Sequence, residues 1–113
     1  MKTILAGSRT ATPQDVDAAI KSCPWVISSV VSGCAVGADT FGAIWARYHN
    51  LPLKCMPADW ERYNKRAGYL RNQDMASESE ALIAVWDGKS KGTAHMIDIA
   101  TKLGLHVHIH KFA

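Results

Sequence analysis

The sequence lacks the marks of several specialised protein classes. Its apolar runs fall well short of the roughly 20 residues that cross a bilayer, and the apolar stretch near its start is too short for a signal peptide. The three cysteines are odd in number and form no CxxC pair, so neither a zinc ribbon nor a disulfide framework is indicated. We therefore expect reduced, buried thiols in a cytoplasmic protein with no membrane partner.

A strong excess of one charge is also missing. The 113 residues carry a net charge of +3, and acidic residues are interspersed with the basic ones. Because 113 residues suit one compact core, we predict a single domain over residues 1–113. One local basic cluster stands out, and it suits a phosphate ligand, an acidic partner or solubility. It consists of Arg62, Lys65, Arg66 and Arg71.

Short apolar runs alternate with helical patterns along the chain. We expect strands at residues 2–6, 26–32, 53–56, 81–86 and 105–110. Helices are expected after Thr12-Pro13, from about residue 41, over about 65–79 and from about residue 96. Thr12 and Asp15 have the spacing of a capping box, and Gly104 suits the end of the last helix.

Five short strands that alternate with helices require parallel pairing through crossover connections. The predicted fold class is therefore α/β, a single Rossmann-like doubly wound parallel sheet of about five strands in the order 3-2-1-4-5. In that order the first and fourth strands meet at the topological switch point, where ligands bind beyond the carboxyl ends. His106, His108 and His110 alternate along the last strand, which we interpret as a polar edge strand, and no metal site is predicted.

Three of the expected strand-to-helix loops combine glycine with hydroxyl residues. They begin at Gly7, Ser32 and Gly88. Glycine lets the backbone approach a ligand closely, and the free N–H groups of a helix N-terminus attract phosphate. None of these loops is a Walker A loop or a GxGxxG fingerprint, so neither ATP hydrolysis nor ordinary NAD chemistry is indicated, and no cofactor is expected.

Five short motifs in this order resemble the YspA-like branch of the SLOG superfamily, along almost the whole chain. They are Gly7-Ser8-Arg9, Ser32-Gly33 with Gly37-Ala38-Asp39, Pro57-Ala58-Asp59-Trp60, Arg71-Asn72 with Met75, and Trp86-Asp87-Gly88 with Ser90 and Gly92-Thr93. The superfamily includes DNA-processing protein A and the LOG phosphoribohydrolases. The resemblance implies a Rossmann-like fold that binds nucleotides or nucleotide-derived signals.

The LOG enzymes combine an arginine-bearing helix motif with a PGGxGTxxE loop. The resemblance carries Arg71 and Gly92-Thr93 over to this chain, but the position of the LOG catalytic glutamate is Met96. A methionine can neither activate water nor stabilise an oxocarbenium-like transition state. Whether the protein is an enzyme is therefore left open, with Arg71, Asp39 and Asp87 as the catalytic candidates.

The predicted ligand-binding residues come from all of these loops and from the arginine-bearing helix. They are Gly7, Ser8, Arg9, Ser32, Gly33, Gly37, Ala38, Asp39, Trp60, Arg71, Asn72, Asp87, Gly88, Ser90, Gly92 and Thr93. For some of them a structural role is an equal alternative. Asp39 suits a helix cap as well as a ribose contact, and Trp60 and Trp86 suit core packing as well as stacking on a base.

The leading hypothesis is a sensor or sequestering module for a nucleotide or nucleotide-derived signal. An alternative is an enzyme that cleaves or transfers at the N-glycosidic or phosphoryl bond of a nucleotide. A second alternative is single-stranded nucleic-acid binding through Arg62, Lys65 and Arg66, with exposed tryptophans stacking on bases. Because one domain carries no appended effector, we also expect a homo-oligomer, a dimer or higher, or an effector protein as partner.

Overall fold

The computed structural model describes residues 1–112 and contains one five-stranded parallel sheet in the order β3-β2-β1-β4-β5. The predicted fold class and strand order are confirmed. The strands are β1 (Lys2–Gly7), β2 (Ser29–Ser32), β3 (Leu53–Cys55), β4 (Ala81–Trp86) and β5 (His106–Lys111). The helices are α1 (Pro13–Lys21), α2 (Ala38–Tyr48), α3 (Trp60–Tyr63), η1 (Asn64–Arg66), α4 (Ala67–Ser77) and α5 (Lys91–Lys102).

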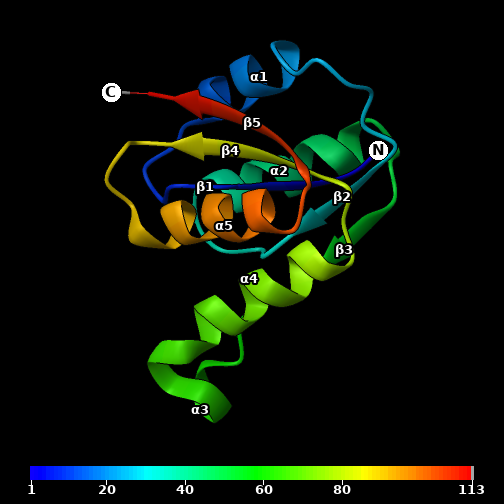
Figure 1. The fold of residues 1–113 in the computed structure, drawn as a ribbon. Coiled ribbons are helices and arrows are strands. Elements are labelled where there is room, and N and C mark those ends of the chain that lie inside the picture. Colours follow the sequence, from blue (N-terminus) through cyan, green and yellow to red (C-terminus); the bar gives the residue numbers. More distant parts are fainter. Residues whose placement is uncertain (113) are drawn as a thin grey trace.

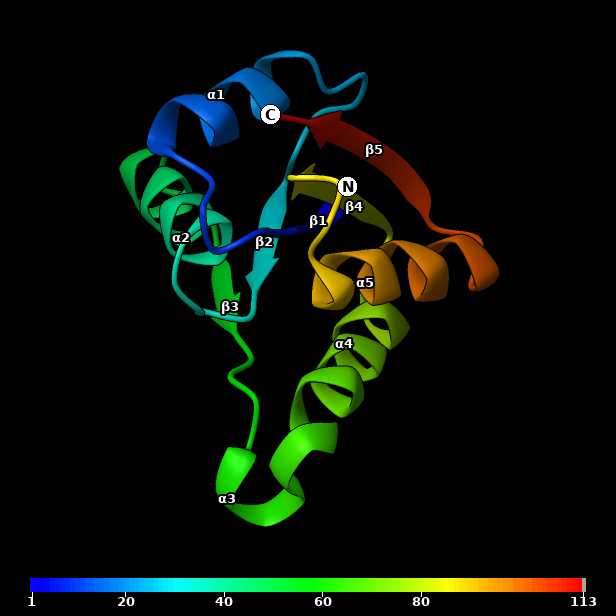
Figure 2. The ribbon, with the colours of Figure 1, turned by 90° about the vertical axis from the view of Figure 1, so that its left-hand side faces the viewer.

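Helices cover both faces of the sheet, with α1 and α2 on one side and α4 and α5 on the other (Figures 1 and 2). Each face has its own apolar core, because successive strand side chains point to opposite faces. Ile4 and Leu82 pack toward Met96 of α5, whereas Leu5 and Ile83 belong to the core on the α1 and α2 side. Burial on both faces explains the continuous apolar runs of β1 and β4.

The predicted start and stop signals of two helices are confirmed. The side chain of Thr12 accepts a hydrogen bond from the Asp15 N–H at 3.2 Å, and the Asp15 carboxylate accepts one from the Thr12 N–H at 2.9 Å. Gly104 follows α5 with φ of +77°, a left-handed conformation that favours glycine.

The second strand is shorter than predicted. β2 begins at Ser29 and not at Val26, because Ser29 pairs with Lys2, the first residue of β1, and residues 26–28 precede any β1 partner. Val26 is 84% exposed, and its carbonyl accepts a hydrogen bond from the terminal ammonium of Met1. The β-branched run from Val26 predicted a longer strand, but β1 begins too late to pair with residues 26–28.

The helix predicted over about residues 65–79 is confirmed as α4, which is shorter than predicted. The preceding residues form α3 and η1, and Asn64, the first residue of η1, has a φ of +51°, which interrupts regular helical geometry at this point. Helix α4 then runs from Ala67 to Ser77. The resulting α3–η1 segment extends away from the sheet as a short arm (Figures 1 and 2). Within residues 1–112 no helix is long and apolar enough to span a bilayer.

The expectation for the cysteines is wrong. Cys34 and Cys55 form a disulfide with a Cα–Cα distance of 5.8 Å, and both residues are exposed. Cys23 is the free cysteine of the described chain and is half-buried. An odd count does not exclude one pair, and parallel pairing places Ser32 and Cys55 in register, two residues before Cys34. Sequence spacing alone did not reveal that proximity.

Candidate functional site

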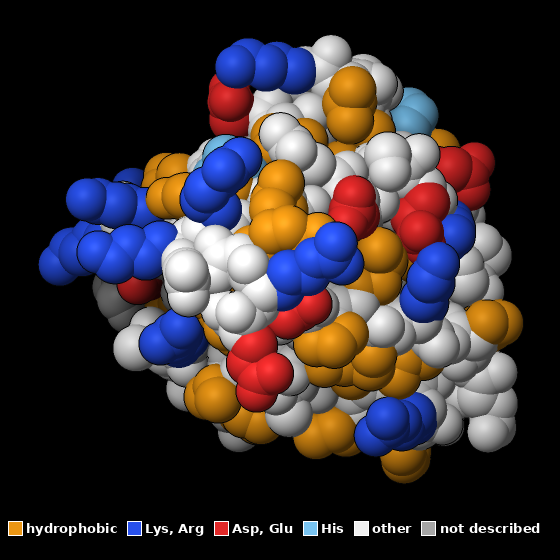
Figure 3. All heavy atoms as spheres, turned by 90° about the horizontal axis from the view of Figure 1, so that it is seen from below, with side chains coloured by type: hydrophobic (Ala, Val, Ile, Leu, Met, Phe, Trp, Pro, Cys, Tyr) orange, Lys and Arg blue, Asp and Glu red, His pale blue; other side chains and the backbone are white. Residues whose placement is uncertain are grey.

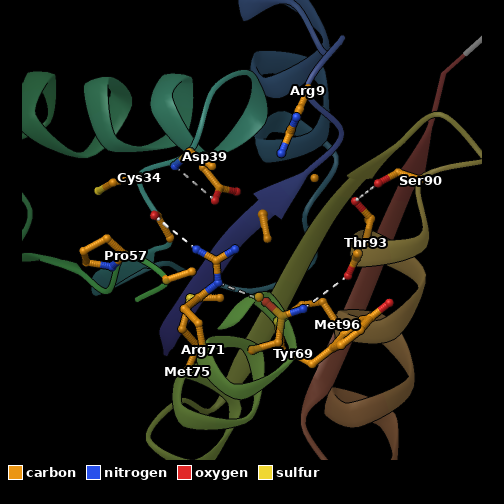
Figure 4. A pocket seen from close by; sticks show the side chains of 18 of the residues that line it. Arg9, Cys34, Asp39, Pro57, Tyr69, Arg71, Met75, Ser90, Thr93 and Met96 are labelled. Atoms are coloured by element: carbon orange, nitrogen blue, oxygen red, sulfur yellow. Dashed lines mark hydrogen bonds between the residues drawn. The ribbon is translucent and has the colours of Figure 1, made fainter. Parts of the chain in front are cut away.

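A cleft of about 550 Å³ lies beyond the carboxyl ends of the central strands. Its walls come from the loops after β1 and β2, the segment after β3, helix α4 and the start of α5 (Figure 4). This is the edge where β1 and β4 adjoin and the chain reverses its winding direction, the usual ligand position in such sheets. The volume lies within the range of small-molecule sites.

Arg71 is the principal cation inside the cleft. It projects from α4 toward the loop after β2, where its Nη1 donates to the Gly33 carbonyl at 3.2 Å, and its Nε donates to Asn72 Oδ1 at 3.2 Å (Figure 4). Within residues 1–112, its Nη2 makes no hydrogen bond to protein. A Cβ on residue 33 would lie 2.2 Å from Arg71 Nη1, so the close approach of the guanidinium requires glycine there.

Asp39 faces the same guanidinium from the first turn of α2. Burial raises the pKa of its carboxyl from 3.8 to about 6, against the opposing effects of the Arg71 charge and of backbone N–H groups at Ala35 and Gly7. The cap of α2 is Gly37, with φ of +87°, so Asp39 does not cap this helix. The Asp39 carboxyl can therefore be protonated or ionised near neutral pH. Beside a fixed cation, such a carboxyl suits hydrogen bonding to a ligand hydroxyl.

The loop before α5 is organised by Asp87. Its carboxylate accepts hydrogen bonds from the N–H groups of Lys89 and Ser90, each at 2.8 Å, and these bonds lower its pKa. The Trp86 indole donates to the Ser90 carbonyl at 3.1 Å. Asp87 and Trp86 therefore shape the loop and do not line the cleft.

The start of α5 presents polar groups to the cleft. Ser90 precedes the helix without a side-chain cap bond, and Thr93 Oγ1 donates to Ser90 Oγ at 3.2 Å. The Asn72 amide nitrogen donates to the Gly92 carbonyl at 3.2 Å and so connects α4 to α5. A helix N-terminus carries a partial positive charge that favours phosphate.

Comparison with known proteins finds a phage relative. The chain is 37% identical over 84 residues to the Gene 61 protein of Mycobacterium phage D29, across 69% of this chain and 67% of that protein. The chain belongs to the Gene 61 family. No family model and no solved structure matches it.

In this Gene 61 family member, ten of the sixteen predicted ligand residues line the cleft. They are Gly7, Arg9, Gly33, Asp39, Trp60, Arg71, Asn72, Ser90, Gly92 and Thr93. The other six do not line it: Ser8, Ser32, Gly37, Ala38, Asp87 and Gly88. Among these, Ser8 Oγ accepts a hydrogen bond from the Asp87 N–H at 3.0 Å and so joins the loops after β1 and β4.

The cleft also contains residues that sequence reasoning did not select as ligand contacts. Tyr69 lines it and packs edge-on against His95 with ring centroids 4.4 Å apart. Met96, at the LOG glutamate position, is buried at its floor. The remaining additions are Ala6, Cys34, Ala35, Val36, Pro57, Ala58, Lys65, Gly68 and Met75. Lys65 already belonged to the basic cluster noted in the sequence, whereas the other residues of this list are small or apolar and carry no chemical signal in a sequence.

The basic cluster of the Gene 61 family member divides between two places. Arg71 lies in the cleft and Lys65 at its margin, whereas Arg62 and Arg66 are exposed on the arm. Arg62 lies over the ring of Tyr63, 5.2 Å from its centroid. In the view from below, several lysine and arginine side chains gather at the left edge, and others are scattered among acidic and apolar side chains over the rest of this face (Figure 3).

Proposed function

We propose that the cleft binds a phosphorylated, nucleotide-like small molecule. The observation that carries this proposal is the Arg71 guanidinium, held by Gly33 and Asn72 in a cleft that includes the start of α5, with no hydrogen bond to Nη2 from the described residues 1–112. Arginine recognises phosphate through paired N–H donors, and a helix N-terminus adds backbone donors. These two features favour an anionic phosphate group as the centre of recognition.

The aromatic residues of the cleft favour a ligand larger than phosphate. Trp60 and Tyr69 line the cleft with 54% and 46% of their surfaces exposed, and Pro57 is also part of the lining. Exposed aromatic faces are suited to stacking on a flat base. Beside Arg71, Asp39 offers a carboxyl to a sugar hydroxyl. A nucleoside phosphate combines all three chemical groups.

The same clustering supports membership of the YspA-like branch of the SLOG superfamily as a proposal. Residues from all five motifs that resemble this branch contribute to one cleft, although the motifs are spread over more than eighty positions of the sequence. Met96 replaces the LOG glutamate at the cleft floor. Its lack of a proton-transfer group favours capture of the ligand, as a sensor or sequestering protein, over its hydrolysis.

Asp39 supports a second candidate, a nucleotide-processing enzyme. A buried carboxyl with a pKa of about 6 can exchange protons near neutral pH, as a general acid or base must. It also lies beside Arg71, which would stabilise developing negative charge. If turnover occurs, Asp39 is the proton-transfer group that we expect, and Asp87 is excluded from that role by its loop hydrogen bonds.

Thermal unfolding of the full chain with a panel of nucleotides tests the proposal. The panel contains nucleoside mono-, di- and cyclic phosphates, ADP-ribose and inorganic phosphate. A binding nucleotide raises Tm by mass action, and chromatography after long incubation distinguishes an intact ligand from base plus sugar phosphate. Arg71→Gln should abolish the shift, whereas Arg47→Gln, at an exposed residue of α2 outside the cleft, should retain it. Equal shifts in both variants would contradict the proposal.

A further inference from the structure

The Cys34–Cys55 disulfide connects the wall of the cleft to the sheet. Cys34 follows Gly33 in the loop after β2 and lines the cleft, while Cys55 is the last residue of β3. Both residues are exposed, so a reagent in solution can reach the bond. Figure 4 shows Cys34 in the loop that approaches Asp39 and Arg71. The disulfide therefore holds a loop of the candidate site and is itself accessible to solvent.

The residues next to the bond make the contacts that organise the cleft. The Gly33 carbonyl accepts from Arg71, the Cys34 N–H donates to Ser32 Oγ at 3.0 Å, and the Ala35 N–H donates to Asp39 Oδ2 at 3.4 Å. Cys34 has a φ of +55°, in the left-handed region that is unfavourable for residues with a Cβ. The disulfide to Cys55 of β3 offsets the cost of this conformation and holds the loop against the Arg71 guanidinium.

We propose that Cys34 and Cys55 form a reversible thiol–disulfide site that controls the order of residues 33–37 and, through them, ligand binding. The effect on binding rests on the function proposed above. The disulfide form holds the loop in its binding conformation, and the dithiol form releases it. Exposed disulfides are the ones that exchange readily, and in a reducing compartment such a bond forms and breaks with the redox state.

The co-reactant is a dithiol. Its thiolate attacks one sulfur of the Cys34–Cys55 bond, which forms a mixed disulfide and releases the other cysteine as a thiolate that takes up a proton. The second thiol of the reagent, as its thiolate, then displaces the remaining cysteine and closes the reagent's own disulfide. The protein gains two electrons and two protons, and the dithiol is oxidised by the same amount. Oxidised reagent reverses the steps.

Cys23 provides the matched control. It is half-buried between α1 and β2, packs against the core on that side of the sheet, and its Sγ donates to the Trp25 carbonyl at 3.5 Å. Because Cys34 and Cys55 are joined by a disulfide, iodoacetamide should modify them only after dithiothreitol has reduced that bond, as measured by peptide mass spectrometry. Modification of both residues in protein treated with oxidised dithiothreitol would overturn the proposal.

Hydrogen exchange of the full chain without ligand is the deciding experiment. In wild type, reduction should speed exchange of the amides of residues 33–37 by about tenfold, while the amides of β4 stay unchanged. Cys55→Ser should match the reduced protein under both conditions, and Cys23→Ser should behave as wild type. Exchange at residues 33–37 that is the same in oxidised and reduced wild type would overturn the proposal without reliance on any variant.

Titration with adenosine 5′-monophosphate then separates this proposal from the one on which it rests. If reduction speeds exchange in residues 33–37 and lowers the nucleotide affinity by about tenfold, both proposals are supported. A loop that responds while no nucleotide of the panel binds in either state supports redox control of loop order and contradicts the proposed function. Equal nucleotide affinity in the two states overturns control of binding and leaves the proposed function standing.

Discussion

At the residue scale, three side-chain positions define the cleft: Gly33, Asp39 and Arg71. Sequence reasoning identified all three, because glycine in a strand-to-helix loop and an arginine in a family motif carry chemical signals. It did not predict that the glycine is required by the guanidinium itself, or that burial alters the acidity of Asp39. Both facts depend on contacts between residues more than thirty positions apart.

Gly33→Ala should weaken nucleotide binding by about tenfold or more, because its Cβ would lie 2.2 Å from Arg71 Nη1 and displace the guanidinium. Isothermal titration with the best ligand of the panel measures the effect. Gly104→Ala is the control for general loss of stability, since its left-handed φ makes alanine unfavourable at a position away from the cleft. Equal affinities of Gly33→Ala and Gly104→Ala would contradict the assigned role.

Asp39→Asn should stabilise the ligand-free protein in a pH-dependent way. The pKa of Asp39 is raised on folding from 3.8 to about 6, so the carboxyl costs no stability below the lower value, and its cost grows between the two values and is complete above about 6. The gain in unfolding free energy should thus rise from near zero at pH 4 toward roughly 3 kcal/mol at pH 7. Urea denaturation measures it, and a gain independent of pH would contradict the burial argument.

At the scale of elements, local signals predicted helix ends better than strand ends. The Thr12 cap and Gly104 act through neighbouring residues, so the sequence alone was sufficient for them. The start of β2 depends on where β1 begins, and the α3–η1 arm depends on a left-handed Asn64. The disulfide depends on the parallel register of β2 and β3. The start of β2 and the disulfide follow from long-range pairing, and the arm follows from the backbone conformation of one residue, so hydrophobic periodicity reveals none of them.

Thr12→Ala should lower the unfolding free energy by about 1 kcal/mol, because it removes the side-chain half of the capping box of α1. Thermal or urea denaturation measures the loss. Thr10→Ala is the matched control, since Thr10 is exposed and its side chain makes no hydrogen bond within residues 1–112. A loss of the same size in both variants would mean that the cap contributes little.

At the scale of the whole molecule, a doubly wound sheet brings separate loops to one edge and leaves an arm with exposed aromatic side chains. Trp60 and Tyr63 are 54% and 41% exposed there. The expected homo-oligomer stays a prediction, and we expect this arm to contribute to its interface. Sedimentation equilibrium should give a mass above 12.3 kDa, and Trp60→Glu should reduce self-association. A wild-type monomer at all concentrations would contradict the prediction.

The most direct test of the central claim is an ¹⁵N NMR titration of the full chain with the nucleotide that gives the largest thermal shift. Ligand in the cleft should perturb the amides of Gly7, Gly33, Gly92 and Thr93 together with the Arg71 Nε signal, while the amides of β5 stay in place. The same titration of Arg71→Gln should leave these four amides unchanged. Saturable shifts confined to β5 or to the α3–η1 arm, with the four cleft amides unmoved, would contradict a nucleotide site in this cleft.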